Sequence, residues 1–258
     1  MTVGSVILVG GGPGSDELLT VGGAAALLEA DVVLYDRLSP HDNLQELAPR
    51  ARHINVGKTP GHHPISQSDI EALIVEHALE GSRVVRLKGG DPYVLGRGSE
   101  EVIACHAAGV PVRVIPGVSS AIAVPAAAGI PLTHRGVSHL FTVVSGHAPL
   151  TDTELEHLAG LGGTIVVLMG IGTLVPLTQG LQRFGSDRDL PVAIIERGYS
   201  ASQKTTLSTL SNVVSDAAEA RVTSPAVLVI GEVVRLAQCD DAAAVAVLAN
   251  AATLSGQR

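Results

Sequence analysis

Short apolar runs alternate with helical patterns along the first half of the chain. The runs cover residues 6–9, 31–35, 53–56, 83–87 and 112–115, and each stops at a glycine, a proline or a charged residue. Segments between them, such as 15–30, 66–81 and 99–108, carry capping residues or apolar positions at helical spacing. Strands that alternate with helices are typical of right-handed βαβ units. The pattern therefore predicts a parallel sheet of five strands.

The second half again alternates strands and helices, but one pair of its strands has only a short connection. Strands are expected at residues 140–145, 164–169, 192–196, 204–210 and 226–230, with helices near 152–159, 174–184 and 211–221. Only about seven residues separate the strand ending at Glu196 from the one starting at Lys204, too few for a helical crossover between parallel strands. The second sheet should be mixed. We predict an α/β protein with an N-terminal domain (1–116), a C-terminal domain (117–240) and a tail (241–258).

Composition agrees with helix-covered sheets and limits the choice of partners. The chain of 258 residues is 46% hydrophobic but only 2% aromatic, so its cores must consist of Val, Leu, Ile and Ala. A net charge of −8 argues against a general nucleic-acid surface. No apolar stretch is long enough to cross a membrane, and no signal peptide is expected. Two cysteines without CxxC spacing fit a reduced compartment, so a cytoplasmic location is expected.

Residues 86–101, R-L-K-G-G-D-P-Y-V-L-G-R-G-S-E-E, combine a strand end, a loop and a helix start. Gly89 and Gly90 leave the backbone bare where the strand stops. Ser99 is expected to cap the following helix, whose first turn holds Glu100 and Glu101. Ligands of open α/β sheets bind at the carboxyl ends of strands. This loop is therefore predicted to form part of a binding site.

Other loops of the first half match known dinucleotide, phosphate or metal motifs only in part. After Gly10 and Gly12, the third glycine of G-x-G-x-x-G is replaced by Ser15, which disfavours a dinucleotide fold. The triplet Gly57-Lys58-Thr59 looks like the end of a phosphate-binding P-loop, but Arg52 stands where such a loop needs its first glycine. His62 and His63 lack a third ligand at a helpful spacing, so no metal is expected.

Taken together, the motifs make the chain resemble the tetrapyrrole methylases, and among them the uroporphyrinogen-III C-methyltransferases. The resemblance covers about residues 5–235 and rests on seven motifs in order: V-G-G-G-P-G-S-D-E-L-L-T, D-V-V-L-Y-D-R-L, V-G-K, V-V-R-L-K-G-G-D-P-Y-V-L-G-R-G-S-E-E, P-G-V-S-S-A, G-I-P-L-T-H-R and S-G-H. Departures include Leu95 and Ser145, where family members often have Phe and Thr, and the E-R-G-Y stretch at 196–199, where they usually have E-N-G-T.

The resemblance implies two domains, a homodimer, and S-adenosylmethionine held in the cleft between the domains. It assigns cofactor contacts to Pro13, Gly89, Gly90, Asp91, Val94, Ser119, Ser120, Met169 and Gly198. It also makes Asp36 the proton acceptor and Lys58 the proton donor. From the residues alone, Asp36 with Lys58 or Arg37 forms either a catalytic group or an ion pair that braces two loops.

The implied reaction is the transfer of two methyl groups to uroporphyrinogen III, which yields precorrin-2 for siroheme or cobalamin synthesis. A methylase of a later corrin precursor is the alternative, and a nucleotide-binding dehydrogenase is a rival of another class. Because the substrate is a polycarboxylate, Arg37, Lys58, Arg97 and Arg135 are candidates to bind it, or else they are solvated surface charges. The dehydrogenase half of fused siroheme synthases is absent, so methylation is the only expected activity.

Overall fold

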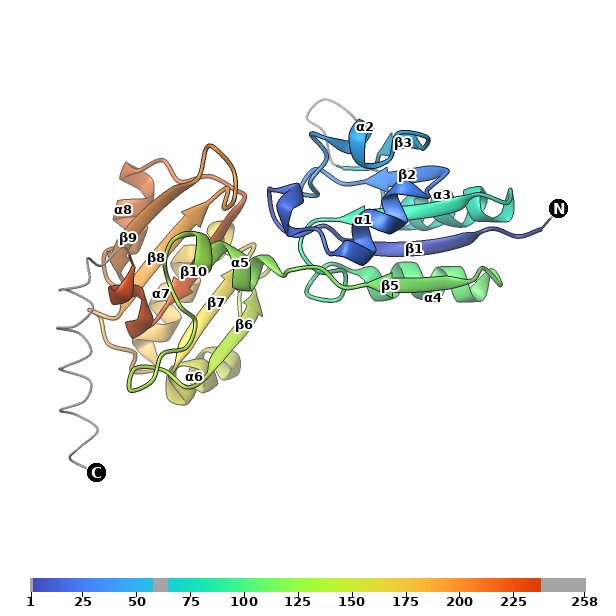
Figure 1. Ribbon diagram of the computed structural model, residues 1–258. Coiled ribbons are helices and arrows are strands. Elements are labelled where there is room, and N and C mark those ends of the chain that lie inside the picture. Colours follow the sequence, from blue (N-terminus) through green and yellow to red (C-terminus); the bar gives the residue numbers. More distant parts are fainter. Residues whose placement is uncertain (1, 58–64, 238–258) are drawn as a thin grey trace. The chain divides into compact units, whose positions relative to one another are not determined.

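The computed structural model describes residues 2–57 and 65–237, and within them the chain forms two compact units that divide after Ser120. Each unit contains its own sheet of five strands (Figure 1). The predicted α/β architecture with a parallel and a mixed sheet is confirmed.

The sheet of the first unit is parallel throughout. Its strands are β1 (Ser5–Gly10), β2 (Val32–Tyr35), β3 (Arg52–Asn55), β4 (Arg83–Lys88) and β5 (Val112–Ile115). They lie in the order β3-β2-β4-β1-β5, so β4 occupies the centre, between β2 and β1. β4 is buried along almost its whole length, as expected for a central strand of a parallel sheet.

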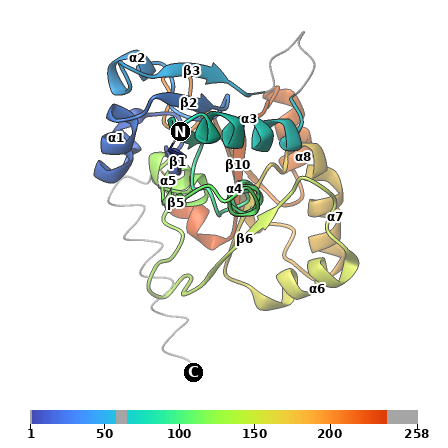
Figure 2. The same cartoon turned by 90° about the vertical axis from the view of Figure 1, so that its right-hand side faces the viewer.

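Helices cover both faces of this sheet. On one face, α3 (Gln67–Leu79) and α4 (Gly98–Ala107) pack through residues such as Ile74 and Cys105. On the other face, α1 (Val21–Leu28) and α2 (Leu44–Leu47) pack through Leu27 and Leu44. Figure 2 shows the strands between α1 and α3.

Two helix starts in the first unit differ from the sequence prediction. The single helix expected over residues 15–30 is a 3-10 turn, η1 (Asp16–Leu18), followed by α1, because Thr20 accepts a hydrogen bond from the Gly23 amide and caps a new start. Helix α4 begins at Gly98, and Arg97 occupies its N-cap with a left-handed φ of 59°. Ser99 is therefore not the cap.

The second unit has a mixed sheet in the order β6-β7-β10-β8-β9. Its strands are β6 (Phe141–Ser145), β7 (Thr164–Leu168), β8 (Pro191–Glu196), β9 (Lys204–Thr209) and β10 (Ala226–Ile230). Only β6 and β7 pair in parallel, and β8 pairs with β9 antiparallel, as their short connection predicts.

Helices also cover both faces of the second sheet. On one face lie α6 (Asp152–Leu161), α7 (Leu174–Arg183) and α8 (Val213–Glu219). On the other lie α5 (Ser120–Ala127) and the 3-10 segment η3 (Glu232–Leu236). Another 3-10 turn, η2 (Ile171–Thr173), precedes α7. No helix in residues 2–57 or 65–237 is long and apolar enough to cross a membrane. The expected tail, 241–258, lies outside the described residues.

Candidate functional site

The carboxyl ends of β1, β4 and β5 form an interlocked group of loops. Because all strands of the first sheet run in parallel, these ends share one edge. Gly12 and Gly90 exchange two backbone hydrogen bonds of 3.2 and 2.9 Å, which join the loops after β1 and β4. Asp91 Oδ2 accepts a hydrogen bond of 3.0 Å from the Gly117 amide after β5, and its Oδ1 accepts one of 2.8 Å from the Tyr93 amide.

Glycine is required at two positions of this group. Gly90 has a left-handed φ of +68°, and a Cβ there would lie 3.5 Å from the Ser120 amide nitrogen. Gly117 packs directly on another loop, since a Cβ would come within 2.5 Å of the Gly10 carbonyl carbon and the Gly90 oxygen. The backbones approach too closely for side chains between them. The three loops therefore meet backbone against backbone, with no side chains between them.

The remaining cofactor candidates of the first unit lie on the same loops. Pro13 is buried and follows the Gly12–Gly90 pair directly, and Gly89 is half-buried between Lys88 and Gly90. Ser119 is buried and Ser120 begins α5. Val94 is 37% exposed in the loop that leads to α4. The structure thus brings together Pro13, Gly89, Gly90, Asp91, Val94, Ser119 and Ser120 along one edge.

Asp36 follows β2 at this same edge and is held by its own turn. Its Oδ1 accepts hydrogen bonds from the amides of Leu38 and Ser39, at 3.2 and 3.1 Å. Its Oδ2 accepts one of 3.2 Å from Arg86 Nη2. The side chain is 28% exposed, so it is held by these bonds and still partly open to solvent.

Arg86 belongs to a buried charged cluster that the sequence prediction missed. Arg86 and Lys88 alternate along β4, and both contact Glu101 Oε1 in the first turn of α4, at 3.0 and 3.1 Å. Burial lowers the pKa of the Lys88 ammonium, and the Arg86 charge adds to this, whereas Glu101 opposes it. The signal was present in the sequence, since two basic residues two apart in an apolar strand share one buried face.

The predicted substrate-binding arginines are all exposed. Arg37 lies in the turn after Asp36, and Arg135 lies in a turn of the second unit between His134 and Ser138. Arg97 forms a two-pronged ion pair with Glu100, with distances of 2.8 and 2.6 Å. That hydrogen bonding lowers the pKa of the Glu100 carboxyl. A substrate carboxylate at Arg97 must therefore compete with Glu100.

Two cofactor candidates, Met169 and Gly198, belong to the second unit. They follow β7 and β8, which are both antiparallel to β10, so their carboxyl ends share one edge of that sheet. Met169 is 48% exposed with a left-handed φ of 60°. Gly198 is buried against Val124 of α5, between two further left-handed residues, Arg197 and Tyr199. Non-glycine residues with such φ values are strained and concentrate at functional sites.

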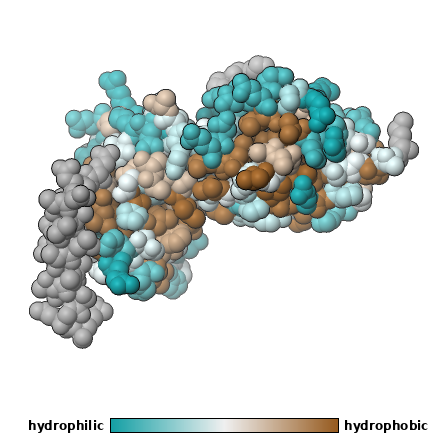
Figure 3. Space-filling view, in the orientation of Figure 1, coloured by the Kyte–Doolittle hydropathy of each residue, from teal (hydrophilic) through white to brown (hydrophobic). Residues whose placement is uncertain are grey.

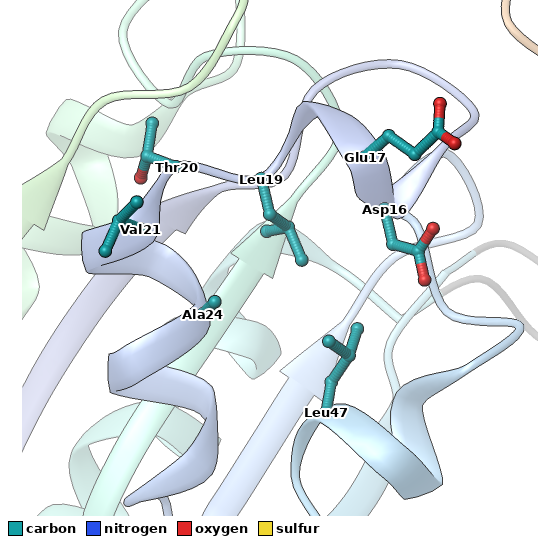
Figure 4. Close-up of a pocket in the computed structure, with 7 residues that line it drawn as sticks. All are labelled: Asp16, Glu17, Leu19, Thr20, Val21, Ala24 and Leu47. Atoms are coloured by element: carbon teal, nitrogen blue, oxygen red, sulfur yellow. The ribbon is translucent and has the colours of Figure 1, made fainter.

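The first unit has a hollow beside the start of α1. A shallow pocket of about 470 Å³ is lined by residues of η1, α1 and α2 and their connections: Asp16, Glu17, Leu19, Thr20, Val21, Ala24 and Leu47 (Figure 4). No predicted site residue lines it. Figure 3 shows apolar surface in the region of α1, where Val21 is 90% exposed.

Some predicted residues fall outside the described part of the chain. Lys58, His62 and His63 lie in residues 58–64, and Cys239 lies in residues 238–258. Within residues 2–57 and 65–237, no group of His, Cys, Asp and Glu side chains has the arrangement of a metal site.

Comparison with known proteins identifies relatives over most of the chain. Residues 5–214 match the model of the Tetrapyrrole (Corrin/Porphyrin) Methylases. An S-adenosyl-L-methionine-dependent uroporphyrinogen III methyltransferase of Methanosarcina barkeri is 46% identical over 90% of this chain and 93% of its own length.

Solved structures agree with this relationship. Uroporphyrin-III C-methyltransferase of Thermus thermophilus, complexed with S-adenosylhomocysteine, has a TM-score of 0.75 and 42% identity over 90% of this chain and all of its own. A cobalt precorrin-4 methyltransferase has a TM-score of 0.76 but only 25% identity, over 89% of this chain and 95% of its own. The matched family model and the 46% identity together show that the chain belongs to the tetrapyrrole methylase family.

Proposed function

We propose that the chain is an S-adenosylmethionine-dependent C-methyltransferase that transfers two methyl groups to uroporphyrinogen III and forms precorrin-2. The observation that carries this proposal is the 46% identity, over 90% of the chain, to a relative named for that reaction. The related structure that binds S-adenosylhomocysteine supports the same methyl donor.

The residues of the first unit fit such a cofactor. The interlocked loops after β1, β4 and β5 meet without intervening side chains, and a Cβ at Gly90 would lie against Ser120, another of the proposed contacts. When bound, the sulfonium supplies an electrophilic methyl group. The proposed contacts are Pro13, Gly89, Gly90, Asp91, Val94, Ser119 and Ser120, together with Met169 and Gly198 of the second unit. Asp91 fixes the loops, because its carboxylate joins the end of β4 to Gly117.

Asp36 is the proposed proton acceptor. Methylation of a pyrrole carbon leaves positive charge on the ring, and a fixed carboxylate nearby stabilises that charge and removes a proton. Its partly exposed, oriented side chain suits this role. Lys58 is proposed as the proton donor from the family resemblance alone.

Exposed arginines are proposed to bind the carboxylates of the substrate. Arg37 follows Asp36 directly, and Arg97 lies in the loop after β4. Arg135 is proposed in the same role in the second unit. Planar guanidinium groups suit carboxylates because they donate two parallel hydrogen bonds. This local positive charge gives an acidic protein the means to hold a polyanion.

Methylation of a later corrin precursor is the second candidate. The cobalt precorrin-4 methyltransferase shares this fold with a TM-score of 0.76, so the fold alone does not select the substrate. The test offers uroporphyrinogen III and a methylated corrin precursor separately, each with labelled S-adenosylmethionine. We expect label only in products of uroporphyrinogen III, and label only with the corrin precursor would assign the second activity.

The resemblance also supports a homodimer that acts in the cytoplasm. A dimer predicts a mass near twice 26.3 kDa by light scattering at micromolar concentration. A mass near 26.3 kDa would refute the dimer without affecting the proposed reaction.

A further inference from the structure

A buried ionic cluster links strand β4, helix α4 and the turn that carries Asp36. Arg86, Lys88 and Glu101 have side chains that are 3%, 5% and 0% exposed. Glu101 Oε1 receives Arg86 Nε at 3.0 Å and Lys88 Nζ at 3.1 Å. Removing charges from water is costly, and proteins retain such groups only with partners. Packing alone does not explain why three charged side chains are buried here.

Every nitrogen of the Arg86 guanidinium has a protein partner. Nε bonds Glu101, Nη1 donates to the carbonyl oxygens of Leu87 and Leu34 at 2.9 and 3.4 Å, and Nη2 donates to Asp36 Oδ2 at 3.2 Å. With 3% of its side chain exposed, Arg86 is not available to a substrate carboxylate. Its guanidinium instead connects β4, β2 and Asp36 through hydrogen bonds.

Arg86 provides the hydrogen bond that holds the second carboxylate oxygen of Asp36. The turn amides of Leu38 and Ser39 hold Oδ1, and Arg86 holds Oδ2. Without Arg86, the side chain keeps only the bonds to one oxygen and its plane is free to turn. Without Glu101, the two buried cations of β4 face each other with no anion between them, and Arg86 loses the partner that fixes Nε.

We propose that Arg86 is the positioning residue for Asp36, and that Glu101 fixes Arg86 for this task. The inference rests on the proposed role of Asp36 as proton acceptor. It assigns a positioning role to a charge cluster whose side chains are at most 5% exposed.

A double-mutant cycle tests whether Arg86 acts through Asp36. We expect Arg86→Gln to lower kcat by about 10²-fold, because a small misplacement of a reacting group costs that much, with the KM values for both substrates little changed. In the double variant Arg86→Gln, Asp36→Asn, kcat should equal that of Asp36→Asn alone, since coupled residues are not additive. Losses that multiply would overturn the proposal. So would unchanged kcat in Arg86→Gln, or a raised KM for uroporphyrinogen III alone.

Matched variants separate positioning from folding. Arg83→Gln removes a cation from the same strand, where it is exposed and pairs with Asp31, and it should leave kcat unchanged. Arg86→Lys keeps the buried charge but not the planar fork, so it replaces Arg86→Gln in the cycle if that variant does not fold. Glu101→Gln should lower kcat in the same non-additive way. If wild type methylates uroporphyrinogen III while Arg86→Gln and Arg86→Lys match its kcat, this inference fails and the proposed function stands; a wild type without methyl transfer refutes the proposed function itself.

Discussion

Asp36 is the residue on which the proposed chemistry depends most. Its carboxylate accepts two backbone hydrogen bonds and one from Arg86, which leaves a partly exposed, oriented base at the end of β2. The sequence placed Asp36 at a strand end beside the glycine loops, because strand ends can be read from apolar runs. The sequence left open whether Asp36 was catalytic or part of an ion pair with Arg37 or Lys58. The structure shows that Asp36 pairs with a different residue, Arg86.

The substitution Asp36→Asn tests this residue directly. Asn does not act as a base, and its NH2 group would face donors on either side, whether Arg86 or the amides of Leu38 and Ser39. We expect kcat to fall by about 10²–10⁴-fold while the affinity for S-adenosylmethionine is kept, as judged by steady-state kinetics and calorimetry. Nearly full kcat would make Asp36 structural and leave catalysis to positioning alone.

Substitutions at Arg97 and Glu100 should change the KM for uroporphyrinogen III in opposite directions. If Arg97 binds a substrate carboxylate, Arg97→Ala should raise the KM for uroporphyrinogen III several-fold, since one charge-assisted contact is lost. Glu100→Gln should lower that KM, because Glu100 competes for the same guanidinium. Arg235→Ala removes a comparable exposed arginine paired with Glu232 and serves as the control. Identical KM values in all three variants would remove Arg97 from the site.

Among the elements, the glycine loop after β4 can be tested for cofactor binding with two matched glycine substitutions. Gly90 and Gly109 have nearly equal φ values, +68° and +69°, and no atom lies within 4 Å of a Cβ built at Gly109. Alanine should destabilise the fold by about 1–2 kcal/mol at either position, because both φ values are left-handed. Only Gly90→Ala should weaken binding of S-adenosylmethionine. Equal cofactor affinities in the two variants would contradict the assignment of this loop.

Helix α4 carries Cys105, whose thiol reports on the packing of the first unit. Burial raises the pKa of Cys105 from 9.0 to about 11, and the Glu101 charge adds to it. The folded state therefore keeps its proton where the unfolded state loses it, so this thiol contributes a loss of stability as pH rises from 9 towards 11. In a Cys239→Ser background, a disulfide reagent at pH 8 should label Cys105 only after urea is added, because the thiolate is the nucleophile. Rapid labelling of the folded protein would contradict this packing.

Most strands could be read from the sequence because each is a short β-branched run with a clear stop, as in β1 and β5. The short link between β8 and β9 likewise gave the mixed second sheet. Helix starts were harder, since Thr20 and Ser15 are both good caps and only tertiary packing decides that both are used. The spacing of Arg86 and Lys88 in an apolar strand hinted at a buried charged pair, but their pairing with Glu101 could not be predicted, because the facing sides of β4 and α4 depend on the folded backbone.

At the scale of the whole molecule, the sequence supplied two α/β halves but not the order of their strands. The order β3-β2-β4-β1-β5 brings the loops after β1, β4 and β5 together, so that Gly12, Gly90 and Gly117 interlock. Three motifs far apart in the chain become one edge of a sheet in this way. This edge and the family relationship together support the proposed methyl transfer.

The most direct test of the account counts the methyl groups that wild-type protein adds to uroporphyrinogen III. With deuterated-methyl S-adenosylmethionine under anaerobic conditions, mass spectrometry should find two labelled methyl groups on carbon atoms of the macrocycle and two molecules of S-adenosylhomocysteine for each product. A macrocycle without label, in the presence of a protein that binds S-adenosylmethionine, would contradict the central claim.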